Sequence, residues 1–180
     1  MKIVIETPTK PLTIIIACVN ISKLIFKGGA GTMLKAKDVA EYFLFKSEPE
    51  EEDYISNLKL QKLLYYAQGF NLAINGEPLF MEPIEAWTHG PVVKALYHEY
   101  KDYGAQNINR PEKIDLDEYD EEAKALLDEV WEVYGQYSAS KLRKLSHEES
   151  PWREAYARCP GAVITQDKMK EFFKSLLVDE

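Results

Sequence analysis

Three histidines, His89, His98 and His147, are the side chains best suited to acid–base or metal chemistry near neutral pH. None has a second ligand at a metal-binding spacing, because the sequence contains no His-Glu-x-x-His, no Cys-x-x-Cys and no Cys/His tetrad. Ser146-His147-Glu148 contains the residue types of a hydrolytic triad, but neighbours in sequence cannot easily align nucleophile, base and acid. We interpret this tripeptide as a helix end with a polar histidine. The sequence therefore predicts no metal site and no catalytic residue.

His89 stands apart because it precedes Gly90-Pro91, a pair that favours a tight backbone turn. Either the turn presents the imidazole to a partner, or the imidazole bonds a carbonyl and locks the turn; we favour the second role. Cys159 would be a nucleophile only with a histidine beside it, so we expect a buried structural thiol. Cys18 and Cys159 lie far apart in dissimilar contexts, which indicates no disulfide and no cofactor site. A reducing cytoplasm is the expected compartment.

The most distinctive element near this turn is a helix predicted over residues 58–74. Its apolar side chains recur at i, i+3, i+4 and i+7, and further apolar residues fill the flanks, so several faces should be buried. Ser56 or Asn57 can cap its first turn, and Asn75-Gly76 can supply the left-handed residue that ends it. We therefore place this helix at the centre of the domain.

A small β-hairpin is predicted to follow this helix. Its strands would be Pro78-Leu79-Phe80 and residues 84–88, with Met81-Glu82-Pro83 as the turn between them. Pro91 then suits the first position of a helix, because its missing N–H would be unbonded there. The apolar spacing predicts that this helix runs from Pro91 to Tyr103.

Five further helices are predicted from apolar stripes and capping residues: 34–46, 119–134, 138–145, one opened by Ser150-Pro151 and one capped by Thr165. Residues 47–54 are expected to form an acidic, solvated linker. The expected fold is mainly α (α+β): a compact helical domain of about six to seven helices around a central buried helix, with a small β-hairpin.

Residues 1–32 differ from the rest of the sequence. Their apolar run over residues 12–19 is shorter than the ~18–20 residues that cross a bilayer, so we expect no membrane span. A signal peptide and a pair of added β-strands are two alternatives for this segment. We prefer a third interpretation, in which Met33 is the natural start and upstream sequence has been translated. The expected division is therefore an N-terminal extension over residues 1–32, which this interpretation treats as non-native, and a domain over residues 33–180.

The formal net charge of −8 is distributed unevenly. Residues 33–180 carry 18 basic and 29 acidic side chains, because residues 1–32 hold four lysines and one glutamate. This acidic balance argues against direct binding of nucleic acid and favours a basic protein partner. Only the predicted helix with Lys141, Arg143 and Lys144 approaches a basic recognition helix. A DNA-binding regulator and a phage-associated hydrolase are kept as alternatives to a protein-binding module.

In order and spacing, four segments resemble the signature of Panacea-domain proteins, also called SocA-like antitoxins or phage-associated GepA-like proteins. These segments are Leu60-Gln61-Lys62-Leu63-Leu64-Tyr65-Tyr66-Ala67-Gln68-Gly69, Pro78-Leu79-Phe80, Ile84-Glu85-Ala86-Trp87 and His89-Gly90-Pro91-Val92. The resemblance covers roughly residues 33–180. It implies an antitoxin, not an enzyme, that neutralises a cognate protein toxin by direct binding. For some members it also implies delivery of the toxin to a host protease.

The region expected to contact the toxin consists of seven residues in and around this signature: Tyr66, Gln68, Trp87, His89, Gly90, Pro91 and Tyr97. Gly90 and Pro91 would set the backbone geometry, whereas the side chains of Trp87 and His89 would make contact. Motifs of Leu, Gly and Pro usually mark the fold, so a wholly structural role for the signature is the alternative.

Overall fold

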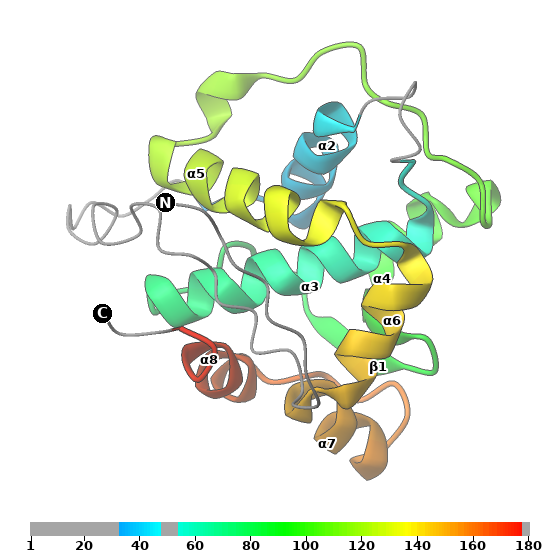
Figure 1. Ribbon diagram of the computed structural model, residues 1–180, viewed down its shortest axis with the longest axis vertical. Coiled ribbons are helices and arrows are strands. Elements are labelled where there is room, and N and C mark those ends of the chain that lie inside the picture. Colours follow the sequence, from blue (N-terminus) through cyan, green and yellow to red (C-terminus); the bar gives the residue numbers. More distant parts are fainter. Residues whose placement is uncertain (1–32, 48–53, 178–180) are drawn as a thin grey trace.

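The computed structural model describes residues 33–47 and 54–177, and it is mainly α-helical (Figure 1). The expectations for residues 1–32 and for the acidic segment 48–53 lie outside the described residues. Within them, seven α-helices accompany one antiparallel pair of strands. The helices are α2 (Ala36–Lys46), α3 (Asn57–Ile74), α4 (Lys94–Glu99), α5 (Glu121–Val130), α6 (Ala139–Glu148), α7 (Ser150–Arg158) and α8 (Gln166–Lys174), and the strands are β1 (Ile84–Trp87) and β2 (Gly90–Val93).

Helix α3 runs through the middle of the molecule, with α2 and α5 on one side and α8 on the other (Figure 1). The Ser56 side chain accepts a hydrogen bond from the Lys59 N–H and caps the first turn. Gly76, at a φ of 81°, lets the chain leave the last turn. Sixteen of the eighteen residues of α3 are buried. The predicted central helix is confirmed, with the predicted ends.

Helix α8 approaches α3 at Gly69, where only a hydrogen fits. A Cβ at position 69 would lie 2.2 Å from the ring of Phe173, a fully buried residue of α8. The same ring packs against Phe70 and Tyr65, with centroid separations of 4.8 and 5.3 Å. Gly69 thus allows one aromatic side chain to fill the space between the two helices.

The predicted composition of the hairpin is wrong. Strand β1 pairs with β2, so that Trp87 stands opposite Gly90 and Thr88-His89 forms the turn. The segment 78–80 lies outside the sheet, because the Gln68 side chain takes the place of a partner strand. Its Oε1 accepts hydrogen bonds from the N–H groups of Leu79 (2.9 Å) and Phe80 (3.2 Å), and its Nε2 donates to the Phe80 carbonyl (2.9 Å).

The predicted start of a helix at Pro91 is also wrong, because Pro91 lies in β2 and α4 begins at Lys94. Pro91 stands opposite Ala86. The backbone of Ala86 is bonded on its other side, where its N–H donates to Ala162 (2.8 Å) and its carbonyl accepts from Gly161 (2.7 Å). The pair Ala86–Pro91 is therefore a non-hydrogen-bonded pair of the ladder, and the missing N–H of proline leaves no bond unmade.

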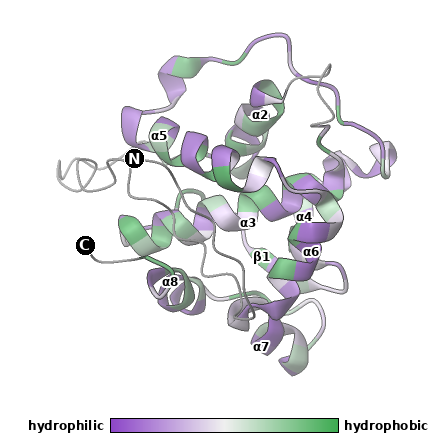
Figure 2. Ribbon diagram, in the orientation of Figure 1, coloured by the Kyte–Doolittle hydropathy of each residue, from purple (hydrophilic) through white to green (hydrophobic). Residues whose placement is uncertain are grey.

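The remaining helices form close to the predicted places. The side chains of Asp120 and Ser138 cap α5 and α6, each accepting a hydrogen bond from an N–H in the first turn. Hydrophobic and hydrophilic residues alternate along α5, as expected for a helix with one buried face (Figure 2). The helix continues as a π-helical turn over Trp131–Gly135. None of the described helices combines the length and the hydropathy needed to cross a membrane.

Candidate functional site beside the hairpin turn

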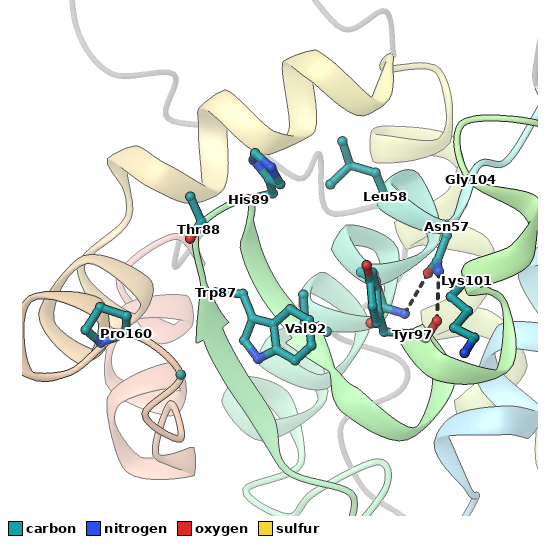
Figure 3. Close-up of a pocket in the computed structure, with 12 residues that line it drawn as sticks. Asn57, Leu58, Trp87, Thr88, His89, Val92, Tyr97, Lys101, Gly104 and Pro160 are labelled. Atoms are coloured by element: carbon teal, nitrogen blue, oxygen red, sulfur yellow. Dashed lines mark hydrogen bonds between the residues drawn. The ribbon is translucent and has the colours of Figure 1, made fainter.

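A pocket of about 590 Å³ opens beside the β1–β2 turn (Figure 3). Four stretches of the chain contribute to its wall: the first turn of α3, the hairpin, the region from α4 to Gly104, and the loop after α7. Because these stretches are distant in sequence, only the folded chain assembles the pocket. The lining residues are Asn57, Leu58, Gln61, Trp87, Thr88, His89, Val92, Tyr97, Lys101, Gly104, Pro160 and Gly161.

Aromatic side chains form the most distinctive part of this wall. The rings of Trp87 and Tyr97 are 4.9 Å apart between centroids, at 60° to each other. The Trp87 indole N–H donates to the Glu85 carboxylate at 2.8 Å, which fixes the ring. Tyr97 is 36% exposed and is among the large apolar side chains that reach solvent. Such rings offer a large, rigid contact area with little conformational entropy to lose.

The wall of the pocket is held in place by two amide side chains of α3 (Figure 3). Asn57 donates to the Tyr97 carbonyl at 3.0 Å and accepts from the Gln61 amide at 3.1 Å. Gln61 in turn accepts a hydrogen bond from the Val93 N–H at 2.8 Å. The relay joins α3 to both β2 and α4, so the aromatic wall is pre-formed.

Three of the seven residues expected to contact a partner, Trp87, His89 and Tyr97, come together in this pocket. The other four are buried. Tyr66 stacks on Tyr134 with centroids 3.9 Å apart, and Gln68 holds the segment 78–80. Gly90 and Pro91 are buried at the start of β2. Contact of all seven residues with a partner stays a prediction.

The sequence reasoning missed several lining residues, including Lys101 and Pro160. Only the packing of the folded chain brings these residues to the hairpin, so no local sequence pattern could predict them. The sequence predicts only a capping role for Asn57, but its side-chain amide donates a hydrogen bond to the Tyr97 carbonyl. In the part of the chain that the structure describes, no hydrogen bond of the His89 ring is found, so its preferred role of bonding a carbonyl is not seen there and stays a prediction. Its side chain is exposed at the tip of the turn.

Lys62 lies directly behind the turn and is completely buried. Its Nζ donates to the Pro91 carbonyl at 2.8 Å. Burial, assisted by the nearby charge of Arg143, lowers the pKa of Lys62 to about 7. With Gln61, which bonds Val93, this side chain satisfies the outer edge of β2 from α3.

The carboxyl group of Glu149, between α6 and α7, is a second buried ionisable group. It accepts a hydrogen bond from the Tyr66 hydroxyl at 2.9 Å. Burial raises the pKa of Glu149 to about 8, although the hydrogen bond from Tyr66 acts in the opposite direction. The folded chain therefore keeps this carboxyl protonated at pH values where the unfolded chain has released the proton.

This difference predicts a dependence of stability on pH. Between the ordinary pKa of 4.5 and about 8, the folded state binds more protons at Glu149, so the free energy of unfolding should fall as pH rises through this window. Glu149→Gln should remove this contribution, on the order of 5 kcal/mol across the whole window at ~1.4 kcal/mol for each pKa unit. Urea unfolding at several pH values measures it, and the exposed neighbour Glu148→Gln is the control. Equal pH slopes for the wild type and Glu149→Gln would contradict the assignment.

The residues of the potential triad do not assemble into one. Ser146 is buried, and its hydroxyl donates to the Arg143 carbonyl of its own helix at 3.0 Å. His147 lies in the last turn of α6, as expected, and stacks on Trp152 with centroids 3.9 Å apart. The prediction of a buried thiol at Cys159 is wrong, because Cys159 follows α7 in an extended conformation and is exposed. Among the described residues, no group of three or more His, Cys, Asp or Glu side chains is placed to hold a metal.

Comparison with known proteins identifies related sequences but no related experimental structure. The family profile described as "Antitoxin SocA-like, Panacea domain" matches residues 60–153, which are 94 of the 180 residues. The protein named antitoxin SocA from Caulobacter vibrioides (strain NA1000 / CB15N) is 36% identical over 121 residues. That alignment covers 61% of this chain and 64% of the relative, so the chain spans slightly less than two thirds of the relative's length. No solved structure matches.

Proposed function

Because this chain belongs to the SocA-like antitoxin family with a Panacea domain, we propose that it is an antitoxin that binds and neutralises a cognate protein toxin. The match over residues 60–153 carries this proposal, and the curated relative that it resembles is named as an antitoxin. The matched region includes the hairpin, α4 and all but four of the residues that line the pocket. We place the toxin-binding surface at this pocket.

The pocket offers the features of a protein-binding hot spot. The exposed edges of Trp87 and Tyr97 give apolar contact area, and the hydrogen-bond relay through Asn57 holds Tyr97 in position before a partner arrives. The acidic balance of residues 33–180 would favour the approach of a basic toxin over long distances. Direct contact with the toxin would then depend on the aromatic wall of the pocket. Long-range attraction of the toxin would depend on the acidic side chains of the wider surface.

Co-expression with the product of the neighbouring gene tests the proposal. The wild-type chain should restore growth that this toxin arrests, whereas Trp87→Ala should weaken toxin binding by roughly 30-fold, the loss of about 2 kcal/mol typical of a hot-spot aromatic. Met81→Ala removes a large side chain that is 61% exposed and lies outside the pocket, so it should behave as the wild type. Thermal unfolding of each purified variant separates lost binding from lost folding.

Toxin levels in the same cells distinguish two routes of neutralisation. If the antitoxin sequesters the toxin, the toxin persists while growth recovers. If it delivers the toxin to a host protease, as the family resemblance implies for some members, the toxin level falls and growth recovery needs that protease. Failure of the wild-type chain to bind or counteract any neighbouring gene product would contradict the antitoxin assignment.

A further inference from the structure

Four basic side chains gather between the hairpin turn and α6: Lys62, His89, Arg143 and His147. Lys62 is buried beneath the turn, and Figure 3 shows His89 on the turn itself, beside the ribbon of α6. Arg143 and His147 are four residues apart on α6 and therefore share one face of that helix. Burial lowers the pKa of His147, and the charges of Arg143, Lys62 and His89 lower it further, so all four groups lie within electrostatic range.

Among the described residues, no ion pair includes a member of this cluster. Arg143 forms no ion pair with a carboxylate anywhere in residues 33–47 and 54–177, although the protein as a whole is acidic. Arg143 Nε and His147 Nε2 are shielded from water, and neither has a hydrogen-bond partner in that part of the chain. Buried donors and acceptors are almost always bonded, so these two nitrogens leave the polar contacts of the cluster incomplete. Both side chains are also partly exposed, so their outer atoms can bond an external group.

The histidine of α6 is also held in a fixed orientation. Its ring lies parallel to the Trp152 indole, with 3.9 Å between centroids and 5° between planes. The Trp152 N–H donates to the Trp87 carbonyl at 3.0 Å, which ties this stack to the wall of the pocket. A group bound at His147 would therefore have a fixed position relative to a partner that packs against Trp87.

We propose that His89, Arg143 and His147 form a binding site for a carboxylate carried by an acidic side chain of the protein partner. The existence of the site is independent of the proposed function, but the identity of the partner rests on it. A guanidinium presents a planar pair of donors that matches a carboxylate, and an imidazole adds a further donor. Lys62 behind the turn has a pKa of about 7 and so contributes only part of a charge at neutral pH. Because the positive charge of the cluster is reduced in this way, a carboxylate with one negative charge suits the site better than a phosphate dianion.

The site can be tested on the purified chain with acetate as the probe. Histidine ring signals in NMR spectra should shift saturably when acetate replaces chloride at constant ionic strength, and the pKa of His147 should rise. Arg143→Gln should weaken the response at least tenfold. Lys144→Gln, which removes the same charge from an exposed position of the same helix, should respond as the wild type. If Arg143→Gln fails to fold, Arg143→Lys, which lacks the planar fork, serves in its place.

Three results would overturn the proposal: no acetate response in the wild type, an undiminished response in the Arg143 variant, or tighter binding of inorganic phosphate than of acetate. Toxin binding supplies a second measurement. Arg143→Gln should bind the cognate toxin at least tenfold more weakly than the wild type and Lys144→Gln. Equal toxin binding by these three proteins would overturn the proposal that a carboxylate of the partner binds here, but it would not contradict the antitoxin function. If the wild type binds no toxin, the antitoxin function fails, and the acetate response alone decides whether the site exists.

Discussion

Replacing Gly90 with alanine is expected to lower the free energy of unfolding by about 3 kcal/mol, the sum of two separate effects. Gly90 has a φ of 103°, which side chains of L-residues rarely adopt. A Cβ there would also lie 2.6 Å from Lys62 Cε and 2.9 Å from the Ser146 hydroxyl. Neither neighbour moves freely, because Lys62 is bonded to the Pro91 carbonyl and Ser146 is buried. Chemical denaturation followed by circular dichroism measures the change.

Gly104→Ala separates these two effects. Gly104 also has a positive φ, of 57°, but a Cβ there would meet nothing within 4 Å. This variant should therefore show the backbone strain alone, about 1–2 kcal/mol. If both alanine variants lose the same stability, the close packing of Gly90 against Lys62 contributes nothing. The glycine of the His-Gly-Pro signature would then serve the turn only.

Phe173→Ala is expected to lower the free energy of unfolding by about 3–5 kcal/mol, the usual effect of removing a fully buried aromatic ring. The Phe173 side chain has no exposed surface and fills the gap between α8 and α3. The adjacent Phe172 is only partly buried, so Phe172→Ala should have a clearly smaller effect. Thermal and urea unfolding of the two variants side by side give the comparison.

The contact between Phe173 and Gly69 predicts strong coupling in a double-mutant cycle. In the wild type, Gly69→Ala should destabilise by about 1–3 kcal/mol, because the new Cβ collides with the ring. In the Phe173→Ala background the collision is gone. The same change should then be neutral, or should stabilise α3 by up to about 1 kcal/mol through the better helix propensity of alanine. Additive effects would contradict the packing described for these helices.

The helices could be predicted from the sequence because their signals are local. The apolar spacing and caps of α3, the cap at Ser138 and the proline that opens α7 each depend on residues within one or two turns. The hairpin could not be predicted in the same way. Its correct pairing depends on Gln68, whose side chain bonds the main chain of residues 78–80, and on residues 161–164, which return to bond β1.

The candidate site was predictable only in part. Trp87, His89 and Tyr97 lie within a short stretch that a turn and a helix bring together, and the sequence grouped them. Tyr66 and Gln68 belong to the same signature but face the core, since a helix buried on most sides conceals even its polar residues. The basic cluster could not be predicted from the sequence, because Lys62 and Arg143 are 81 positions apart. Only the packing of α6 against α3 and β2 joins them.

The hairpin has consequences for how a partner can be recognised. Gln61 and Lys62 bond the outer border of β2, residues 161–164 cover β1, and Arg158 in turn bonds the Val163 carbonyl at 3.1 Å. With its main-chain groups engaged in this way, the small sheet offers little template for an incoming strand, the means by which many domains capture extended peptides without regard to their sequence. A ligand of this protein must be read through side chains. Selectivity for one target would then reside in a few replaceable residues, on a scaffold that can stay constant while they diverge.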